Sequence, residues 1–109
     1  MRDESPLRTP DGKYLIVRGR LWRATNPALT EDVRSGLTSG LMAARREVRA
    51  ALATKDAIRL KAARSAVNSA KIALGERGPV WWQDGSPDFN RYLVKNTPYS
   101  AWYDATQVS

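Results

Sequence analysis

The chain has 109 residues and a mass of 12.1 kDa, of which 42% are hydrophobic and 27% charged, and its net charge is +7. This composition is typical of a globular protein and predicts a single domain over residues 1–109, with residues 1–12 partly flexible. The sequence contains neither cysteine nor histidine, which excludes disulfides and removes the usual ligands of zinc and haem and the usual nucleophile pairs. We therefore expect no metal site and no cofactor, and we assign no catalytic residue.

Membrane and export signals are also missing from the sequence. No apolar run approaches the ~18 residues of a membrane span. The first ten residues, MRDESPLRTP, have no apolar segment of the kind that a secretory signal requires. We therefore expect a cytoplasmic protein that does not contact a membrane.

The first predicted element is a β-hairpin over residues 13–24. It is rich in β-favouring side chains, and a glycine marks its turn. The sequence predicts a two-residue loop made of Gly19 and Arg20. A Pro-Asp-Gly turn signal upstream favours a short third strand at residues 7–8.

Two antiparallel helices are predicted next, over residues 31–53 and 57–74. Each carries an apolar stripe at three- and four-residue intervals, and the two stripes are expected to pack together. Thr30 and Asp56 are suitable N-caps, and Gly75 is a suitable C′ residue. One continuous helix through both segments is the alternative, because neither glycine nor proline interrupts them.

The second helix has a second stripe of apolar and small residues, roughly opposite the first. It consists of Ile58, Ala62, Ser65, Ser69 and Ile72. A helix with two such stripes is usually covered on both sides. We expect the second stripe to contact the C-terminal aromatics, the β-hairpin or another subunit, and we favour a homodimer.

The C-terminal part is rich in aromatic residues and contains two helix-start signals. Ser86-Pro87-Asp88 predicts a short helix through Val94, and Thr97-Pro98 predicts another that contains Trp102. The predicted fold is therefore α+β and mostly α: an N-terminal β-hairpin, a long antiparallel helical hairpin, and an aromatic-rich C-terminal cap of short helices.

Four segments, YLIVRGRLWR, LMAARREV, ALGERGPVWW and NTPYSAWY, together resemble a family of small uncharacterised bacterial proteins, some of which are labelled biopolymer transporter Tol. The resemblance covers most of residues 12–103. It implies a bacterial origin and transfers no reaction and no catalytic residue.

The aromatic segment supplies the first candidate site, a ligand or partner surface. Its members are Trp81, Trp82, Asp84, Asp88 and Tyr92. In one interpretation the indoles stack on a ligand while the carboxylates act as acid and base. In the favoured interpretation at least one of the two tryptophans is a core residue, packed on the helical hairpin with Trp102 as its neighbour.

Arginines supply the second candidate site, a phosphate-binding surface. Its members are Arg18, Arg20, Arg23, Arg45 and Arg49. Lys61, Arg64 and Lys71 form a further basic edge on the second helix, and phosphate contacts follow if these edges converge. Such edges are more often a solvated border beside an apolar stripe.

These features favour a non-catalytic interaction module that associates with itself. The +7 net charge makes nucleic-acid binding the alternative. A small carboxylate-dependent enzyme ranks third, and no small-molecule ligand can be assigned.

Overall fold

The computed structural model describes residues 6–107, which divide into two compact units. The sheet unit contains residues 6–24 and 82–107, and the helical-hairpin unit contains residues 25–81. The fold is mixed α+β and mostly helical, as the sequence predicted. The single domain stays a prediction.

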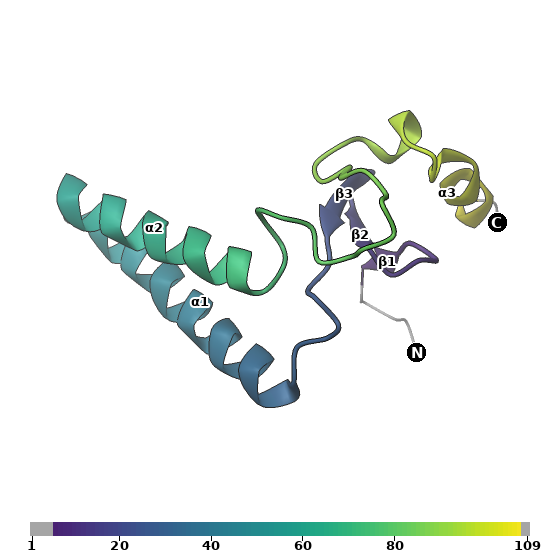
Figure 1. The fold of residues 1–109 in the computed structure, drawn as a ribbon. Coiled ribbons are helices and arrows are strands. Elements are labelled where there is room, and N and C mark those ends of the chain that lie inside the picture. The colour runs from purple at the N-terminus through teal and green to yellow at the C-terminus, as the bar shows by residue number, and fades with distance from the viewer. Residues whose placement is uncertain (1–5, 108–109) are drawn as a thin grey trace, which may run out of the picture. The chain divides into compact units, whose positions relative to one another are not determined.

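The sheet has three short antiparallel strands in the order β1-β2-β3 (Figure 1). They are β1 (Leu7–Arg8), β2 (Tyr14–Val17) and β3 (Arg20–Arg23). The predicted third strand at residues 7–8 is thus confirmed. The flexibility expected for residues 1–12 falls partly on residues 1–5, which lie outside the described residues.

The loop between β2 and β3 differs from the predicted one. Val17 pairs with Arg20, so the loop consists of Arg18 and Gly19 instead of Gly19 and Arg20. Arg18 has φ 54° and Gly19 has φ 76°, as a tight turn that matches the twist of the strands requires. The shift changes the pairing by two residues, so each strand side chain stays on its expected face.

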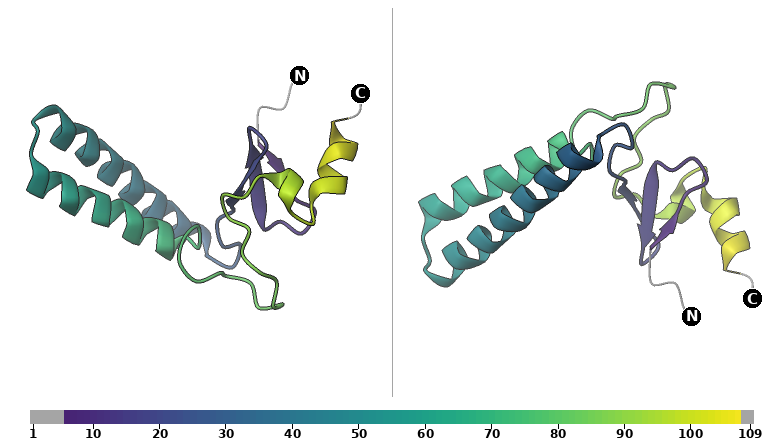
Figure 2. Two further views of the ribbon diagram at one scale, coloured as in Figure 1. Left: turned by 90° about the horizontal axis from the view of Figure 1, so that it is seen from above. Right: turned by 90° about the horizontal axis from the view of Figure 1, so that it is seen from below.

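The two long helices form the helical-hairpin unit and lie side by side in Figures 1 and 2. Helix α1 spans Glu31–Ala53 and helix α2 spans Ala57–Ala73. Both predicted N-caps are confirmed: the Thr30 hydroxyl accepts from the Val33 N–H, and the Asp56 carboxylate accepts from the Arg59 N–H.

The chain reverses between α1 and α2, so the alternative of one continuous helix is wrong. Lys55 has φ 56° and takes the left-handed conformation that ends many helices. At the other end of the hairpin, Gly75 has φ 85°, and the Asn26 N–H donates to the Leu74 carbonyl over 2.8 Å. A Cβ on Gly75 would come within 2.9 Å of both Asn26 and Trp81, so this position requires glycine.

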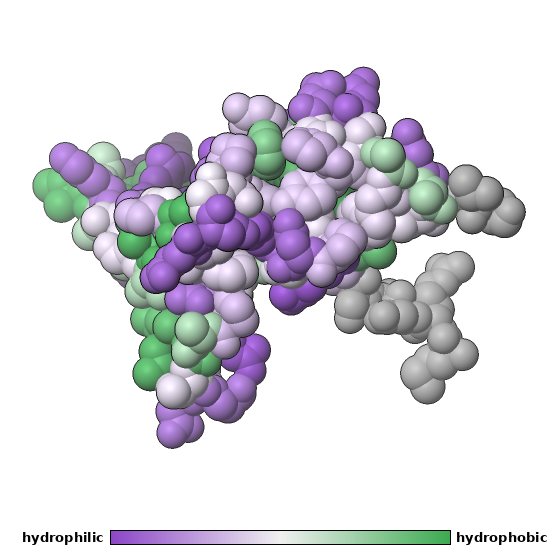
Figure 3. All heavy atoms as spheres, turned by 45° about the vertical axis from the view of Figure 1, so that its right-hand side comes forward, coloured by the Kyte–Doolittle hydropathy of each residue, from purple (hydrophilic) through white to green (hydrophobic). Residues whose placement is uncertain are grey.

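The predicted seam between the helices is present. Its fully buried members are small or aliphatic: Leu41, Ala44, Ala51, Ala63 and Leu74. The second stripe of α2 remains exposed, with Ile58 at 86% and Ile72 at 43% of their full accessibility. Figure 3 shows hydrophobic side chains on the surface of the helical hairpin, next to hydrophilic ones.

The start of the C-terminal part does not form the short helix that the sequence predicted. Residues 86–94 are not a helix; Leu93 forms a β-bridge with Arg20, and Leu21 exchanges two backbone hydrogen bonds with the segment at Arg91 and Tyr92. A 3₁₀ turn, η1 (Val94–Asn96), and helix α3 (Ser100–Thr106) follow. The predicted helix that contains Trp102 is confirmed.

Candidate functional site

Trp82 is a core residue of the sheet unit. Only 8% of it is exposed, and its ring meets the ring of Tyr14 edge-on with 5.6 Å between centroids. Its indole N–H donates to the Ser86 carbonyl over 2.9 Å. The expectation that one tryptophan of the pair is buried is confirmed, but the partner found is Tyr14 of β2, where the sequence pointed to the helical hairpin. Trp81 belongs to the helical-hairpin unit and is half-buried.

The two candidate carboxylates form ion pairs with residues of the β-hairpin. Asp84 pairs with the Lys13 ammonium, and Asp88 pairs with the Arg23 guanidinium at 3.0 Å. The side chains of the two cations are only 8% and 1% exposed. Hydrogen bonding from Lys13 lowers the pKa of Asp84 to about 2, so this group is ionised at neutral pH. These two ion pairs stabilise the contact between the C-terminal segment and the sheet.

Two tyrosine side chains extend this polar network, which is partly buried. The Tyr14 hydroxyl accepts from the Phe89 N–H over 2.7 Å, and burial raises the pKa of Tyr14 to about 12. The Tyr99 hydroxyl donates to Asp11 over 2.6 Å, and burial together with this hydrogen bond raises the pKa of Tyr99. Sequence reasoning missed Lys13, Asp11 and Tyr99, because their partners lie more than 70 positions away and no local pattern marks them. Tyr92 is half exposed and contacts Phe89 edge-on.

The five candidate phosphate-binding arginines are divided between the two units. Arg23 is buried against Asp88. Arg18 and Arg20 lie in the sheet unit, where with Val17 and Trp22 they line a shallow pocket of about 380 Å³. Arg20 also donates to the carbonyl of Arg91. Arg45 and Arg49 lie on α1 in the helical-hairpin unit.

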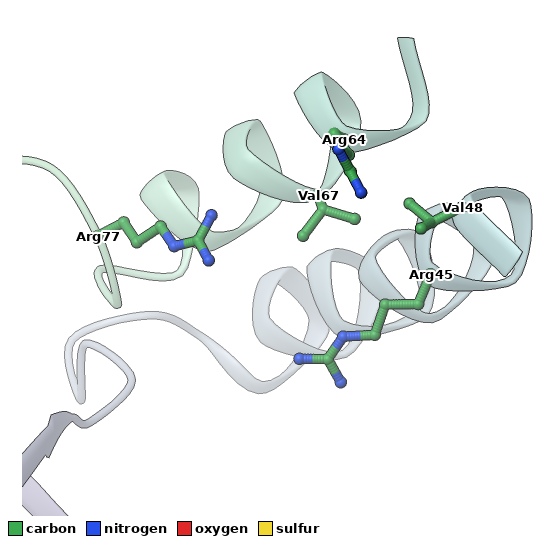
Figure 4. Close-up of a pocket in the computed structure, with 5 residues that line it drawn as sticks. All are labelled: Arg45, Val48, Arg64, Val67 and Arg77. Carbon is green, nitrogen blue, oxygen red and sulfur yellow. The ribbon is translucent and has the colours of Figure 1, made fainter. Parts of the chain in front are cut away.

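A basic groove on the helical hairpin brings together arginines from three segments. Arg45 of α1, Arg64 of α2 and Arg77 of the loop after α2 line a groove of about 400 Å³. Val48 and Val67 form its apolar floor, and Figure 4 shows them between the helices with the three arginine side chains around them. One residue from each predicted basic edge, Arg45 of α1 and Arg64 of α2, lines the groove. Arg49 does not line the groove, and Arg77, which lines it, was not among the predicted phosphate-binding residues.

The charge of this groove is not balanced by the protein. Arg77 donates to the Asn68 side chain over 3.3 Å, whereas the side chains of Arg45 and Arg64 form no hydrogen bond or ion pair within residues 6–107. No acidic side chain lines the groove. Residues 25–81 contain ten basic and five acidic side chains, which leaves this unit with a net positive charge. The groove can therefore hold an anion.

Other kinds of site find no support in the described part of the chain. Residues 6–107 contain no group of three acidic, cysteine or histidine side chains that could hold a metal ion. No helix within the same residues is long and apolar enough to cross a membrane.

No family model, curated protein or solved structure matches the chain significantly. The functional proposals below therefore rest on the geometry of the two units.

Proposed function

We propose that the protein is a non-catalytic interaction module that forms a homodimer through the second stripe of α2. The observation that carries this proposal is the exposure of that stripe, above all of Ile58, which is 86% accessible. An exposed isoleucine on an ordered helix has an unfavourable contact with water that a second copy of the chain would remove. The proposal places this dimer in the bacterial cytoplasm.

The residue pattern of the stripe suits pairing with a second copy. Its members are separated by four, three, four and three residues, as in a helix–helix seam. The large residues Ile58 and Ile72 stand at equal distances from Ser65 along the chain. In an antiparallel pair with a two-fold axis at Ser65, Ile58 would face Ile72 of the partner subunit. The small residues between them would allow the two helices to approach closely.

Charges beside the stripe do not oppose this arrangement. The stripe itself contains no charged residue. By helical geometry Lys61 borders one side, and in the antiparallel pair it would lie opposite Asn68 of the partner subunit. A lysine facing an amide avoids the repulsion that two facing like charges would produce.

Light scattering on the purified protein tests the dimer. We expect the mass of two chains at micromolar concentration and the mass of one chain for Ile58→Glu, with unchanged helical circular dichroism. Met42→Glu is the matched control, because Met42 is exposed on α1 outside the stripe and its substitution should leave the dimer intact. A monomeric wild type at high micromolar concentration would contradict the proposal.

Nucleic-acid binding is the second candidate function, and the basic groove favours it. Its expected sign is a strong fall in affinity with rising salt, because phosphate contacts release counterions. A carboxylate-dependent enzyme receives no support from the geometry. Asp84 is paired with Lys13 and its pKa is lowered to about 2, whereas a general acid needs a raised pKa.

A further inference from the structure

We propose that the basic groove of the helical hairpin is a binding site for a small organic phosphate of about nucleotide size. The site consists of Arg45, Arg64 and Arg77 around the floor formed by Val48 and Val67. It is separate from the Ile58 stripe, and binding there does not depend on the proposed dimer.

The first argument concerns the unbalanced charge. Three guanidinium groups from α1, α2 and the following loop share one groove without an acidic neighbour in its lining. Other acids of this unit are engaged elsewhere: Glu47 pairs with Arg59, and Glu76 accepts from the Thr25 hydroxyl over 2.7 Å. The three positively charged guanidinium groups repel one another. A bound anion would attract all three and so offset this repulsion.

The second argument concerns the kind of anion. Arginine presents a planar set of donors that matches the oxygens of phosphate and often binds them in pairs. Three guanidinium groups suit the charge of close to −2 of a phosphate monoester better than the single charge of a carboxylate. The phosphate group is therefore the ligand chemistry that this groove fits.

The third argument concerns the rest of the ligand. Val48 and Val67 provide an apolar surface beside the three cations, which inorganic phosphate alone would leave uncovered. The groove volume of about 400 Å³ lies in the range of small-molecule sites. Both features favour a phosphate ester that carries a partly apolar group.

Asn68 acts in this site as a positioning residue. Its side-chain oxygen accepts from the Arg77 guanidinium over 3.3 Å and so directs a loop arginine toward the helices (Figure 4). Asn68→Ala should weaken binding less than Arg77→Ala. Asn68→Asp keeps an acceptor oxygen for Arg77 but adds a negative charge beside the groove, so it should weaken the binding of adenosine monophosphate and leave the binding of adenosine unchanged.

Isothermal titration calorimetry at low salt tests the site with adenosine monophosphate, adenosine, inorganic phosphate and a single-stranded oligonucleotide. We expect adenosine monophosphate to bind more tightly than adenosine and inorganic phosphate. Arg45→Ala and Arg64→Ala should each weaken its binding about 10-fold, as loss of a charged hydrogen bond does. Arg46→Ala is the control, since this exposed arginine of α1 lies outside the groove.

Three results would overturn the proposal. One is no binding of adenosine monophosphate to the folded wild type. Another is binding that Arg45→Ala, Arg64→Ala and Arg46→Ala weaken equally, which indicates a diffuse charge effect. The third is binding of the oligonucleotide alone, which would replace this site by the nucleic-acid alternative. The Ile58→Glu variant should bind adenosine monophosphate like the wild type, so failure of the dimer and failure of this site can be distinguished.

Discussion

The two units of the protein are stabilised by different kinds of interior. In the helical-hairpin unit, the buried side chains are apolar and come from two adjacent helices joined by a tight reversal. In the sheet unit, the buried side chains include the polar ones of Thr9, Lys13, Arg23 and Thr97. Ion pairs join Lys13 and Arg23 of this unit to residues more than 60 positions away in the chain.

This difference determines how each unit should respond to substitution. Truncation of a side chain in an apolar seam lowers the free energy of unfolding more when more buried volume is removed, because these side chains stabilise the unit through packing. A buried cation depends on its charge partners: Arg23 would lose the carboxylate of Asp88, whereas Lys13 would keep Asp11 at 3.9 Å if Asp84 were removed. The sheet unit should therefore be the more sensitive of the two to single polar substitutions.

The largest expected effect is that of Trp82→Ala. Loss of this ring removes the packing on Tyr14 and the hydrogen bond to Ser86, and should lower the free energy of unfolding by ~3–5 kcal/mol. Chemical denaturation measures the loss, and hydrogen exchange should locate it in the strands. Trp22→Ala is the control, since Trp22 is 41% exposed against 8% for Trp82 and its loss should cost less. Equal effects of the two substitutions would show that Trp82 is not part of the core.

Leu41→Ala should have the next largest effect, and on the other unit. Leu41 is buried in the seam, and its truncation should cost ~2–5 kcal/mol. Hydrogen exchange should increase in α1 and α2 and leave the strands protected. Leu52→Ala, at an exposed position of α1, serves as the control. Equal loss of protection in the strands would mean that the two units unfold together.

A smaller, stabilising effect is expected at the reversal between the helices. Lys55 holds a left-handed conformation, which glycine adopts without steric cost, so Lys55→Gly should raise the free energy of unfolding by about 0.5–1 kcal/mol. Lys61→Gly, in the exposed interior of α2, should instead lower it by about 1 kcal/mol. The same sign of change for both variants would contradict the assigned reversal.

The smallest effect is expected at Asp84, because this carboxylate is exposed. Its pKa is lowered to about 2 in the folded protein, so the stability it contributes is present above the ordinary pKa of 3.8. That contribution is lost as the pH falls from about 4 to about 2. In Asp84→Asn this part of the acid dependence should disappear, whereas Asp104→Asn should keep it. Denaturant midpoints measured across this pH range test the difference.

Much of the helical hairpin could be predicted because its signals are local. Thr30, Asp56 and Gly75 each satisfy backbone groups within three residues or so of their own position, and the seam follows from residue spacing. In the sheet, the predicted position of the loop between β2 and β3 was wrong by one residue. A short segment with turn signals allows more than one pairing when the pairings place the same side chains inward.

The C-terminal segment and the basic groove could not be predicted in this way. Ser86-Pro87-Asp88 has the pattern of a helix start, yet Asp84 and Asp88 are held by Lys13 and Arg23 and the chain continues along β3. Arg77 has no sequence feature that links it to Arg45. In both cases the deciding contacts join residues that are distant in the chain.

The sequence by itself determined the two long helices, their N-caps and the seam between them, because helix periodicity and capping depend on neighbours a few residues apart. Only the tertiary structure decided that Trp82 packs on Tyr14, that the candidate carboxylates serve as charge partners, and that three arginines share one groove. The physical reason is that these contacts join residues far apart in the chain. The free energy that stabilises them comes from burial and ion pairing in the folded protein, and local sequence patterns do not reveal it.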